Sequence, residues 1–121
     1  KVFVRTCKPQ QSRAETNDGI EQLKAVLCND LHKDLPLNTL AKEFSANPYT
    51  LIRRFKAVTG ITPHAYRMNC RIEQAKRLLR DGHDIADTAI DCGFFDQSHF
   101  HRHFKAMTTV TPQEYRVNFI Q

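Results

Sequence analysis

The 121-residue chain is long enough for one compact domain or two very small subdomains, and its hydrophobic fraction of 40% supports a modest core. Its formal net charge of +5 is compatible with an anionic partner without requiring one. The sequence contains no apolar run of membrane-spanning length and no visible secretory leader, so we expect a soluble, cytoplasmic protein that does not bind membranes.

A polar tail and one helix are predicted first. Residues 1–17 lack sustained periodicity, which is typical of an interdomain linker. From about Asp18, apolar residues recur at intervals of three and four and predict a helix that ends before Pro36. The apolar stripe of this helix consists of Ile20, Leu23, Leu27 and Leu31.

Two shorter helices with a tight turn between them are predicted next. The first spans 37–44. After the turn, Asn47 suits the N-cap and Pro48 the first position of a helix over 49–59. Gly60 can adopt the left-handed conformation that ends this helix. The buried face of the second helix is predicted to consist of Leu51, Phe55 and Val58.

The second half of the chain is predicted to repeat this order. A long helix runs from Pro63 to about Leu79. No segment shows the alternation of a strand, so the sequence predicts an all-α fold. The remaining helices are expected over 85–92, over 97–107 with Asp96 as its N-cap, and from Pro112 to about Phe119.

Positive charge is concentrated in the middle of the chain. Residues 48–80 contain eight Lys or Arg and one acid, a net charge of +7, whereas the rest of the chain sums to −2. Such a separation favours binding to a polyanion, although a solvated basic helix face would give the same pattern.

The four cysteines are widely spaced and include no CxxC pair. This spacing is typical of ordinary thiols in a reducing compartment. We therefore expect free thiols at Cys7, Cys28, Cys70 and Cys92.

The strongest signal is an internal duplication. Aligned without gaps, residues 51–67 and 100–116 agree at nine of seventeen positions. Upstream, Ala41 pairs with Ala89 at an offset of 48 rather than 49, so the second copy has one extra residue in its turn. Each copy has a short helix, a tight turn and a second helix, which is the helix-turn-helix plan that presents its second helix to the major groove of DNA. The alternative is a plain helical repeat that only stacks for stability.

The second copy also carries a family signature. It contains Ile85-Ala86, Ala89, Gly93-Phe94, Ser98-x-Phe100 and Phe104-Lys105, followed by Thr111-Pro112-x-x-Tyr115-Arg116. This pattern resembles the C-terminal signature of the arabinose-operon regulator (AraC/XylS) family. The first copy is similar to the more variable first helix-turn-helix of that family.

The resemblance covers about residues 18–119 and implies a fold of seven helices. Two helix-turn-helix subdomains would lie at 18–62 and 82–121, joined by a linker helix over 63–81. The seventeen residues from Pro63 to Leu79 span about 25 Å at 1.5 Å per residue, which is compatible with reading two successive major grooves.

The resemblance further implies a bacterial transcription regulator, usually an activator, that binds double-stranded promoter DNA. It implies contact with RNA polymerase and a separate N-terminal effector or dimerisation domain. The acids over residues 81–96 could dock a basic patch of polymerase, or they could form a solvated face. These acids are Asp81, Asp84, Asp87, Asp91 and Asp96.

Carried over by position, the resemblance also implies which residues contact DNA. Arg53 and Arg102 suit bidentate contacts to guanine, although each could instead contact a phosphate. The predicted base contacts are Tyr49, Thr50, Ile52, Arg53, Gln97, His99, His101 and Arg102. The predicted phosphate contacts are Arg54, Lys56, Arg67, Arg71, Ser98 and Lys105.

Two positions depart from the family pattern. Thr109 stands where relatives often have glycine, so we expect a strained or altered corner there. Ile52 is apolar where relatives are often polar; it could touch a thymine methyl group or make no base contact.

The histidines of the second copy invite a metal interpretation. His99 and His103 share a helix face, four residues apart. No carboxylate or cysteine is placed near them by the sequence to complete a ligand shell, so we expect neither a metal ion nor a cofactor.

Two other functions are compatible with part of the sequence. A DNA-repair alkyltransferase with a similar domain would need a zinc-bound nucleophilic cysteine, which the scattered cysteines do not provide, so we do not expect an enzyme. A nonspecific nucleic-acid-binding or architectural domain would explain the charge. It would not explain the duplicated scaffold or the polar faces of the two reading helices.

Overall fold

The computed structural model describes residues 17–119 and divides into two compact units. The described residues form seven helices and no strand, which confirms the predicted all-α class. None of these helices is long and apolar enough to cross a membrane. The predicted tail over 1–17 lies, apart from Asn17, outside the described residues.

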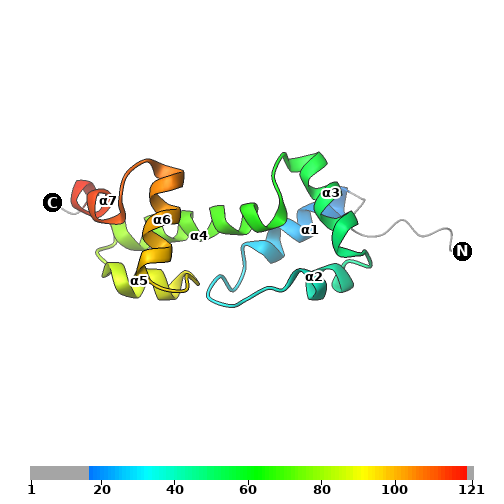
Figure 1. Cartoon of the computed structure of the whole chain (residues 1–121), viewed down its shortest axis with the longest axis horizontal. Helices are drawn as coiled ribbons and strands as arrows, with labels where there is room; N and C mark the ends of the chain where they lie inside the picture. Colours follow the sequence, from blue (N-terminus) through cyan, green and yellow to red (C-terminus); the bar gives the residue numbers. More distant parts are fainter. Residues whose placement is uncertain (1–16, 120–121) are drawn as a thin grey trace, which may run out of the picture. The chain divides into compact units, whose positions relative to one another are not determined.

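The first unit comprises residues 17–26 and 35–63 of the described part. Its helices are α1 (Asn17–Leu27), α2 (Leu37–Glu43) and α3 (Pro48–Thr59), with α2 packed on α3 (Figure 1). The buried side chains of this unit include Ile20, Leu23, Leu40, Ala41, Phe44, Leu51 and Phe55.

The second unit comprises residues 27–34 and 64–119 of the described part. Its helices are α4 (Pro63–Arg80), α5 (Ile85–Asp91), α6 (Gln97–Thr108) and α7 (Pro112–Phe119), and α6 packs on both α5 and α7 (Figure 1). Its core includes Met68, Ile72, Ala75, Leu79, Ala89, Cys92, Phe94, Phe100, Phe104 and Tyr115.

Helix α1 is shorter than its apolar stripe predicts. It ends at Leu27, and Leu31 lies in the following loop, where Asp30 has a left-handed φ of 48°. The carbonyls of this loop accept hydrogen bonds from the guanidinium of Arg67. Because these carbonyls accept hydrogen bonds from Arg67, they do not accept the backbone N–H groups of a further helical turn.

The two helix-turn-helix turns differ by one residue, as the sequence predicts. Four residues separate α2 from α3, and five separate α5 from α6. Ser45 and Gly93 occupy equivalent left-handed positions, with φ values of 55° and 90°. Both turns are closed by a backbone bond to an alanine, from Ala46 N–H to Ala41 O and from Phe94 N–H to Ala89 O.

The ends of the second helices are also equivalent. Thr59 donates from its hydroxyl to the carbonyls of Phe55 and Ile61, and Thr108 makes the same pair of bonds in its own unit. The next residue adopts the left-handed conformation in both units, with φ of 89° at Gly60 and 71° at Thr109. The strained corner predicted at Thr109 is thus present, because a β-branched side chain is disfavoured at this φ.

The prediction that all four cysteines are free thiols is wrong for two of them. Cys28 and Cys70 form a disulfide, with their Cα atoms 5.5 Å apart. Cys92 is a free, buried cysteine. Cys7 lies outside the described residues.

Candidate nucleic-acid interface

Helix α3 is anchored from one side and exposed on the other. Leu51 and Phe55 are fully buried, and the Asn47 side chain accepts the Thr50 N–H as an N-cap. The predicted burial of Val58 is wrong, since its side chain is 47% exposed. The helix therefore offers a broad outer face that its own unit does not cover.

Among the predicted base contacts on α3, Tyr49 and Arg53 are the most accessible. The Tyr49 ring is 72% exposed, and the Arg53 guanidinium carbon lies 5.4 Å from its centroid. This cation–π contact limits the orientations of the arginine. Thr50 and Ile52 are half-buried, so they present less surface to a ligand.

Helix α6 is built in the same way. Phe100 and Phe104 are fully buried, and the Asp96 side chain accepts the His99 N–H at the helix start. Four side chains on its outer face border one open depression of about 440 Å³. They are Gln97, Ser98, His101 and Arg102, all of them exposed and all among the predicted DNA contacts.

His99 is placed differently from the other predicted readers of α6. It is half-buried, and its ring packs edge-on against His103 at 4.5 Å and against Phe94 at 5.6 Å between centroids. Its Nδ1 accepts a hydrogen bond from the backbone N–H of Phe95, which lies in the turn that is one residue longer than its counterpart in the first unit. In the neutral ring, Nε2 therefore carries the proton, so this side chain can only donate to a base from that nitrogen.

The environment of His103 disfavours its charged form. Burial lowers the pKa of this histidine, and the neighbouring His99, Arg102 and His64 lower it further. The charged form of His103 is thus less populated than that of a free histidine side chain. Within residues 17–119, no group of three or more His, Cys, Asp or Glu side chains is arranged to hold a metal ion.

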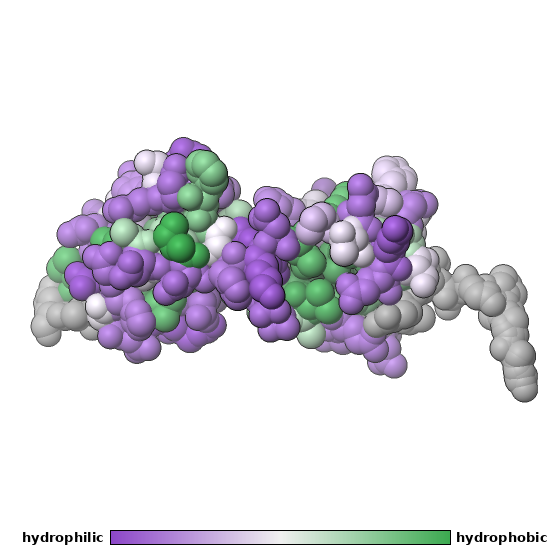
Figure 2. Space-filling view, turned by 90° about the horizontal axis from the view of Figure 1, so that it is seen from below, coloured by the Kyte–Doolittle hydropathy of each residue, from purple (hydrophilic) through white to green (hydrophobic). Residues whose placement is uncertain are grey.

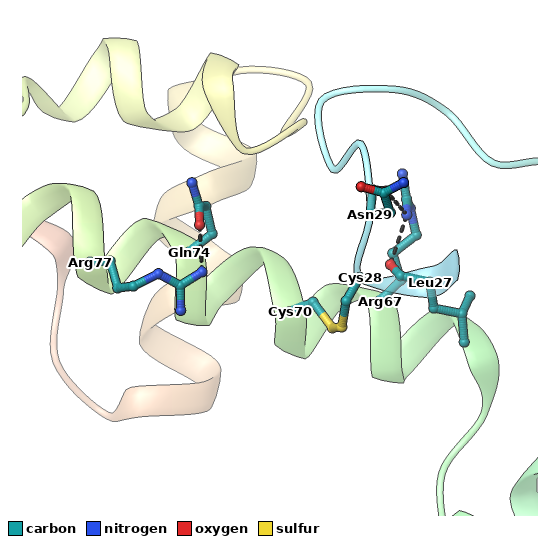
Figure 3. Close-up of a disulfide and its surroundings, with 7 residues drawn as sticks. All are labelled: Leu27, Cys28, Asn29, Arg67, Cys70, Gln74 and Arg77. Carbon is teal, nitrogen blue, oxygen red and sulfur yellow. Dashed lines mark hydrogen bonds between the residues drawn. A yellow bond between two sulfur atoms is a disulfide. The ribbon is translucent and has the colours of Figure 1, made fainter. Parts of the chain in front are cut away.

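The phosphate contact predicted for Arg67 is wrong. This side chain is 8% exposed, and its two terminal nitrogens donate to four backbone carbonyls, those of Leu27, Asn29, Asp30 and Lys33. Figure 3 shows the bonds to Leu27 and Asn29. Burial lowers its pKa, and the nearby Arg71 adds to that effect. A guanidinium that is occupied in this way is a structural clamp and is not available to DNA.

The internal repeat contains a signal for this role. Arg116 is the equivalent of Arg67, and it donates to the carbonyls of Gly82 and His83 in the loop after α4. The shared arginine thus holds the loop that precedes each helix-turn-helix. Arg71 is half-buried, and one of its nitrogens donates to Lys33 O at 3.2 Å.

The other predicted phosphate contacts lie at the surface. Lys56 and Arg54 are exposed on α3, and Ser98 and Lys105 are exposed on α6. In the view of Figure 2, hydrophilic side chains cover much of the visible face of each unit, with smaller hydrophobic patches among them. By their exposure, Arg54, Lys56, Ser98 and Lys105 are accessible to a charged ligand.

Two of the five acids over residues 81–96 have a structural role. Asp84 accepts the N–H groups of Ala86 and Asp87 at the start of α5, and Asp96 caps α6. The exposed acids that remain are Asp81, Asp87 and Asp91.

Comparison with known sequences agrees with this architecture. A family model described as a helix-turn-helix domain matches residues 40–118. The chain is 31% identical over 100 residues to the HTH-type transcriptional activator RhaS of Salmonella arizonae, which covers 82% of this chain and 36% of the relative. It is 36% identical over 85 residues to the uncharacterized HTH-type transcriptional regulator YbfI of Bacillus subtilis, which covers 70% of this chain and 31% of that relative.

Solved structures share the fold. The DNA-binding domain of AdpA, crystallised in complex with a target DNA, matches with a TM-score of 0.77 and 28% identity, over 83% of this chain and 91% of that chain. The C-terminal domain of AraT, a response regulator from Geobacillus stearothermophilus, matches with a TM-score of 0.77 and 26% identity, over 82% and 84% of the two chains.

The two units and their matches define a helix-turn-helix DNA-binding domain. The chain belongs to the arabinose-operon regulator (AraC/XylS) family, which confirms the resemblance seen in the sequence. It spans about a third of the length of the curated relatives that it matches.

Proposed function

We propose that this chain is the promoter-reading domain of a bacterial transcription activator, which inserts α3 and α6 into adjacent major grooves of double-stranded DNA. The observation that carries the proposal is the equivalence of two outward helices. Each is anchored by buried residues of its own unit, and each exposes an arginine at the same repeat position, Arg53 on α3 and Arg102 on α6. A repeat that served stability alone would not need matched cations on its uncovered faces.

Within this proposal, the exposed side chains have two roles. Tyr49, Arg53, Gln97, His101 and Arg102 contact base edges, with Thr50, Ile52 and His99 as smaller or partly covered contributors. Arg54, Lys56, Ser98 and Lys105 contact phosphates and fix the register of the helices on the duplex. Arg71 keeps a phosphate contact only through the part of its guanidinium that the loop does not use.

The rival is a domain that binds nucleic acid without sequence preference. To separate the two, binding sites are selected from random duplex DNA, and the best site is compared with a shuffled duplex of equal length and composition. A specific regulator keeps a preference of at least about 10³-fold as the salt concentration rises, while both affinities fall. If the two duplexes bind equally at every salt concentration, the domain is nonspecific and the proposal is wrong.

The proposal extends to the parent protein and its partners. The length of the curated relatives supports a further domain outside this chain. We propose that this domain serves effector binding or dimerisation and that the whole protein acts in the cytoplasm. The exposed Asp81, Asp87 and Asp91 would contact a basic surface of RNA polymerase. Replacing them by asparagine should reduce activated transcription without changing DNA affinity. An unchanged transcription level would show that these three acids do not contact RNA polymerase.

A further inference from the structure

Apart from Arg71, which follows Cys70 on α4, the proposed DNA contacts lie outside the part of the second unit that holds the disulfide. Cys28 opens the loop that follows α1, and Cys70 lies on α4 (Figure 3). Cys28 is exposed and Cys70 is half-buried. A small thiol or disulfide in solution can therefore reach the Cys28 sulfur.

The same loop is in contact with the turn of the second helix-turn-helix. The carbonyl oxygen of Leu31 and the guanidinium of Arg71 lie so close to Gly93 that an added Cβ there would collide with both. Gly93 is the left-handed residue between α5 and α6. The loop backbone thus packs directly against the turn from which α6 starts.

We propose that Cys28 and Cys70 form a reversible thiol–disulfide modification site, oxidised by low-molecular-weight disulfides, whose state controls how firmly the 27–34 loop supports the α5–α6 turn. In the oxidised form, the loop has a covalent tether at Cys28 in addition to the bonds from Arg67. In the reduced form, hydrogen bonds and packing alone hold the loop. The loop is then held less firmly against the turn at Gly93, and that turn is less stable.

The chemistry of the site is balanced thiol–disulfide exchange. The Cys28 thiolate attacks one sulfur of the small disulfide, which releases one small thiolate and leaves a mixed disulfide on Cys28. The Cys70 thiolate then attacks the Cys28 sulfur and displaces the second small thiol. The two protein thiols lose two electrons to the small disulfide and two protons to the small thiolates that are released. Excess small thiol reverses both steps.

The remaining described cysteine does not compete for the oxidant. Cys92 is fully buried, and burial raises the pKa of its thiol to about 12. It therefore stays protonated and inaccessible, since the thiolate is the reactive form. The modification is specific to the Cys28–Cys70 pair among these residues.

The test compares the two redox states of the full 121-residue chain. Cys7→Ser is introduced first, because this cysteine lies outside the described residues and would add its own reactions. The chain is equilibrated in buffers of reduced or oxidised glutathione, thiols are counted by mass spectrometry, and amide exchange is followed in peptides that cover 92–99 and 112–118.

We expect oxidation to remove two thiols and to slow exchange over residues 93–96 by about tenfold, because tethering a long loop is worth at least that factor. Residues 112–118 of α7 lie outside the 28–70 segment that the disulfide closes, and they should exchange at the same rate in both states. Cys70→Ser in the same background should stop the reaction at the mixed disulfide of Cys28, so one thiol is lost and exchange over residues 93–96 is not slowed. Cys92→Ser should leave the full response intact.

Two results would overturn the proposal. One is that Cys28 and Cys70 stay reduced in oxidised glutathione. The other is that residues 93–96 exchange equally fast with the pair oxidised and reduced, which would show that Arg67 and packing alone support the turn.

Discussion

A swap between the two repeat units measures the strain at the end of α6. Thr109 has a φ of 71°, in the left-handed region where an L-residue with a Cβ is disfavoured by about 1–2 kcal/mol. Replacing it by glycine removes that cost, but the greater freedom of glycine stabilises the unfolded chain by about 0.4–1 kcal/mol. The difference predicts that Thr109→Gly raises the free energy of unfolding by about 0.5–1 kcal/mol.

The reverse substitution in the first unit should have the opposite effect. Gly60 has a φ of 89°, and a Cβ added there meets nothing within 4 Å, so Gly60→Thr adds backbone strain without a clash. It should lower the stability of the first unit by a similar amount. Calorimetry and urea unfolding measure both changes, and we expect shifts of about 2–6 °C in the unfolding temperature.

Thr109→Ala is the matched control, because alanine keeps the Cβ that causes the strain. It should gain much less than Thr109→Gly. If glycine and alanine at position 109 give the same stability, the gain does not come from the left-handed φ, and the reasoning is refuted.

Three further predictions concern stability and binding. Arg67→Met should lower the free energy of unfolding by at least about 3 kcal/mol, because it leaves four loop carbonyls without their donor. Arg116→Met removes only two exposed hydrogen bonds and should lower it clearly less. Equal losses in the two variants would contradict the structural role of Arg67. Because the pKa of His103 is lower in the folded than in the unfolded state, the unfolded state binds more protons as the pH falls through the ordinary histidine range near 6.5, so stability falls there. The drop in unfolding temperature between pH 7.5 and 5.5 should be smaller for His103→Gln, and an unchanged drop would assign the effect to other groups. Lys56→Ala and Lys105→Ala should each weaken binding to all duplexes alike and reduce the slope of log K against log salt by about one. Binding titrations at several salt concentrations measure both effects. A loss of affinity for one sequence only would show that these lysines contact bases.

Local signals were sufficient for most of the helices. Asn47 and Gly60 mark the ends of α3 within the sequence, because a cap bonds to residues of its own helix. The end of α1 could not be predicted in this way. It depends on Arg67, whose guanidinium binds the loop carbonyls from about forty positions further along the chain.

The same distinction holds for the interface. Outward positions such as Arg53 and Arg102 follow from helical periodicity and from the burial of their neighbours. The charge of Arg67 predicted a phosphate contact, but its burial gives it a structural role. In the sequence, only its equivalence to Arg116 in the repeat indicates that role. The Cys28–Cys70 disulfide joins residues 42 apart in the sequence, and nothing in the local pattern marks the pair.

In the proposed function, α3 and α6 each read their own block of DNA sequence. This is tested most directly by selecting preferred sites from random duplex DNA with the unmodified chain, with Arg53→Ala and with Arg102→Ala. We expect an asymmetric site of two blocks about 10 base pairs apart, with one block relaxed in each variant and a loss of about 1–3 kcal/mol at the preferred site. If both variants select the same site as the unmodified chain and lose only overall affinity, the two arginines contact phosphates, and the account of sequence reading is contradicted.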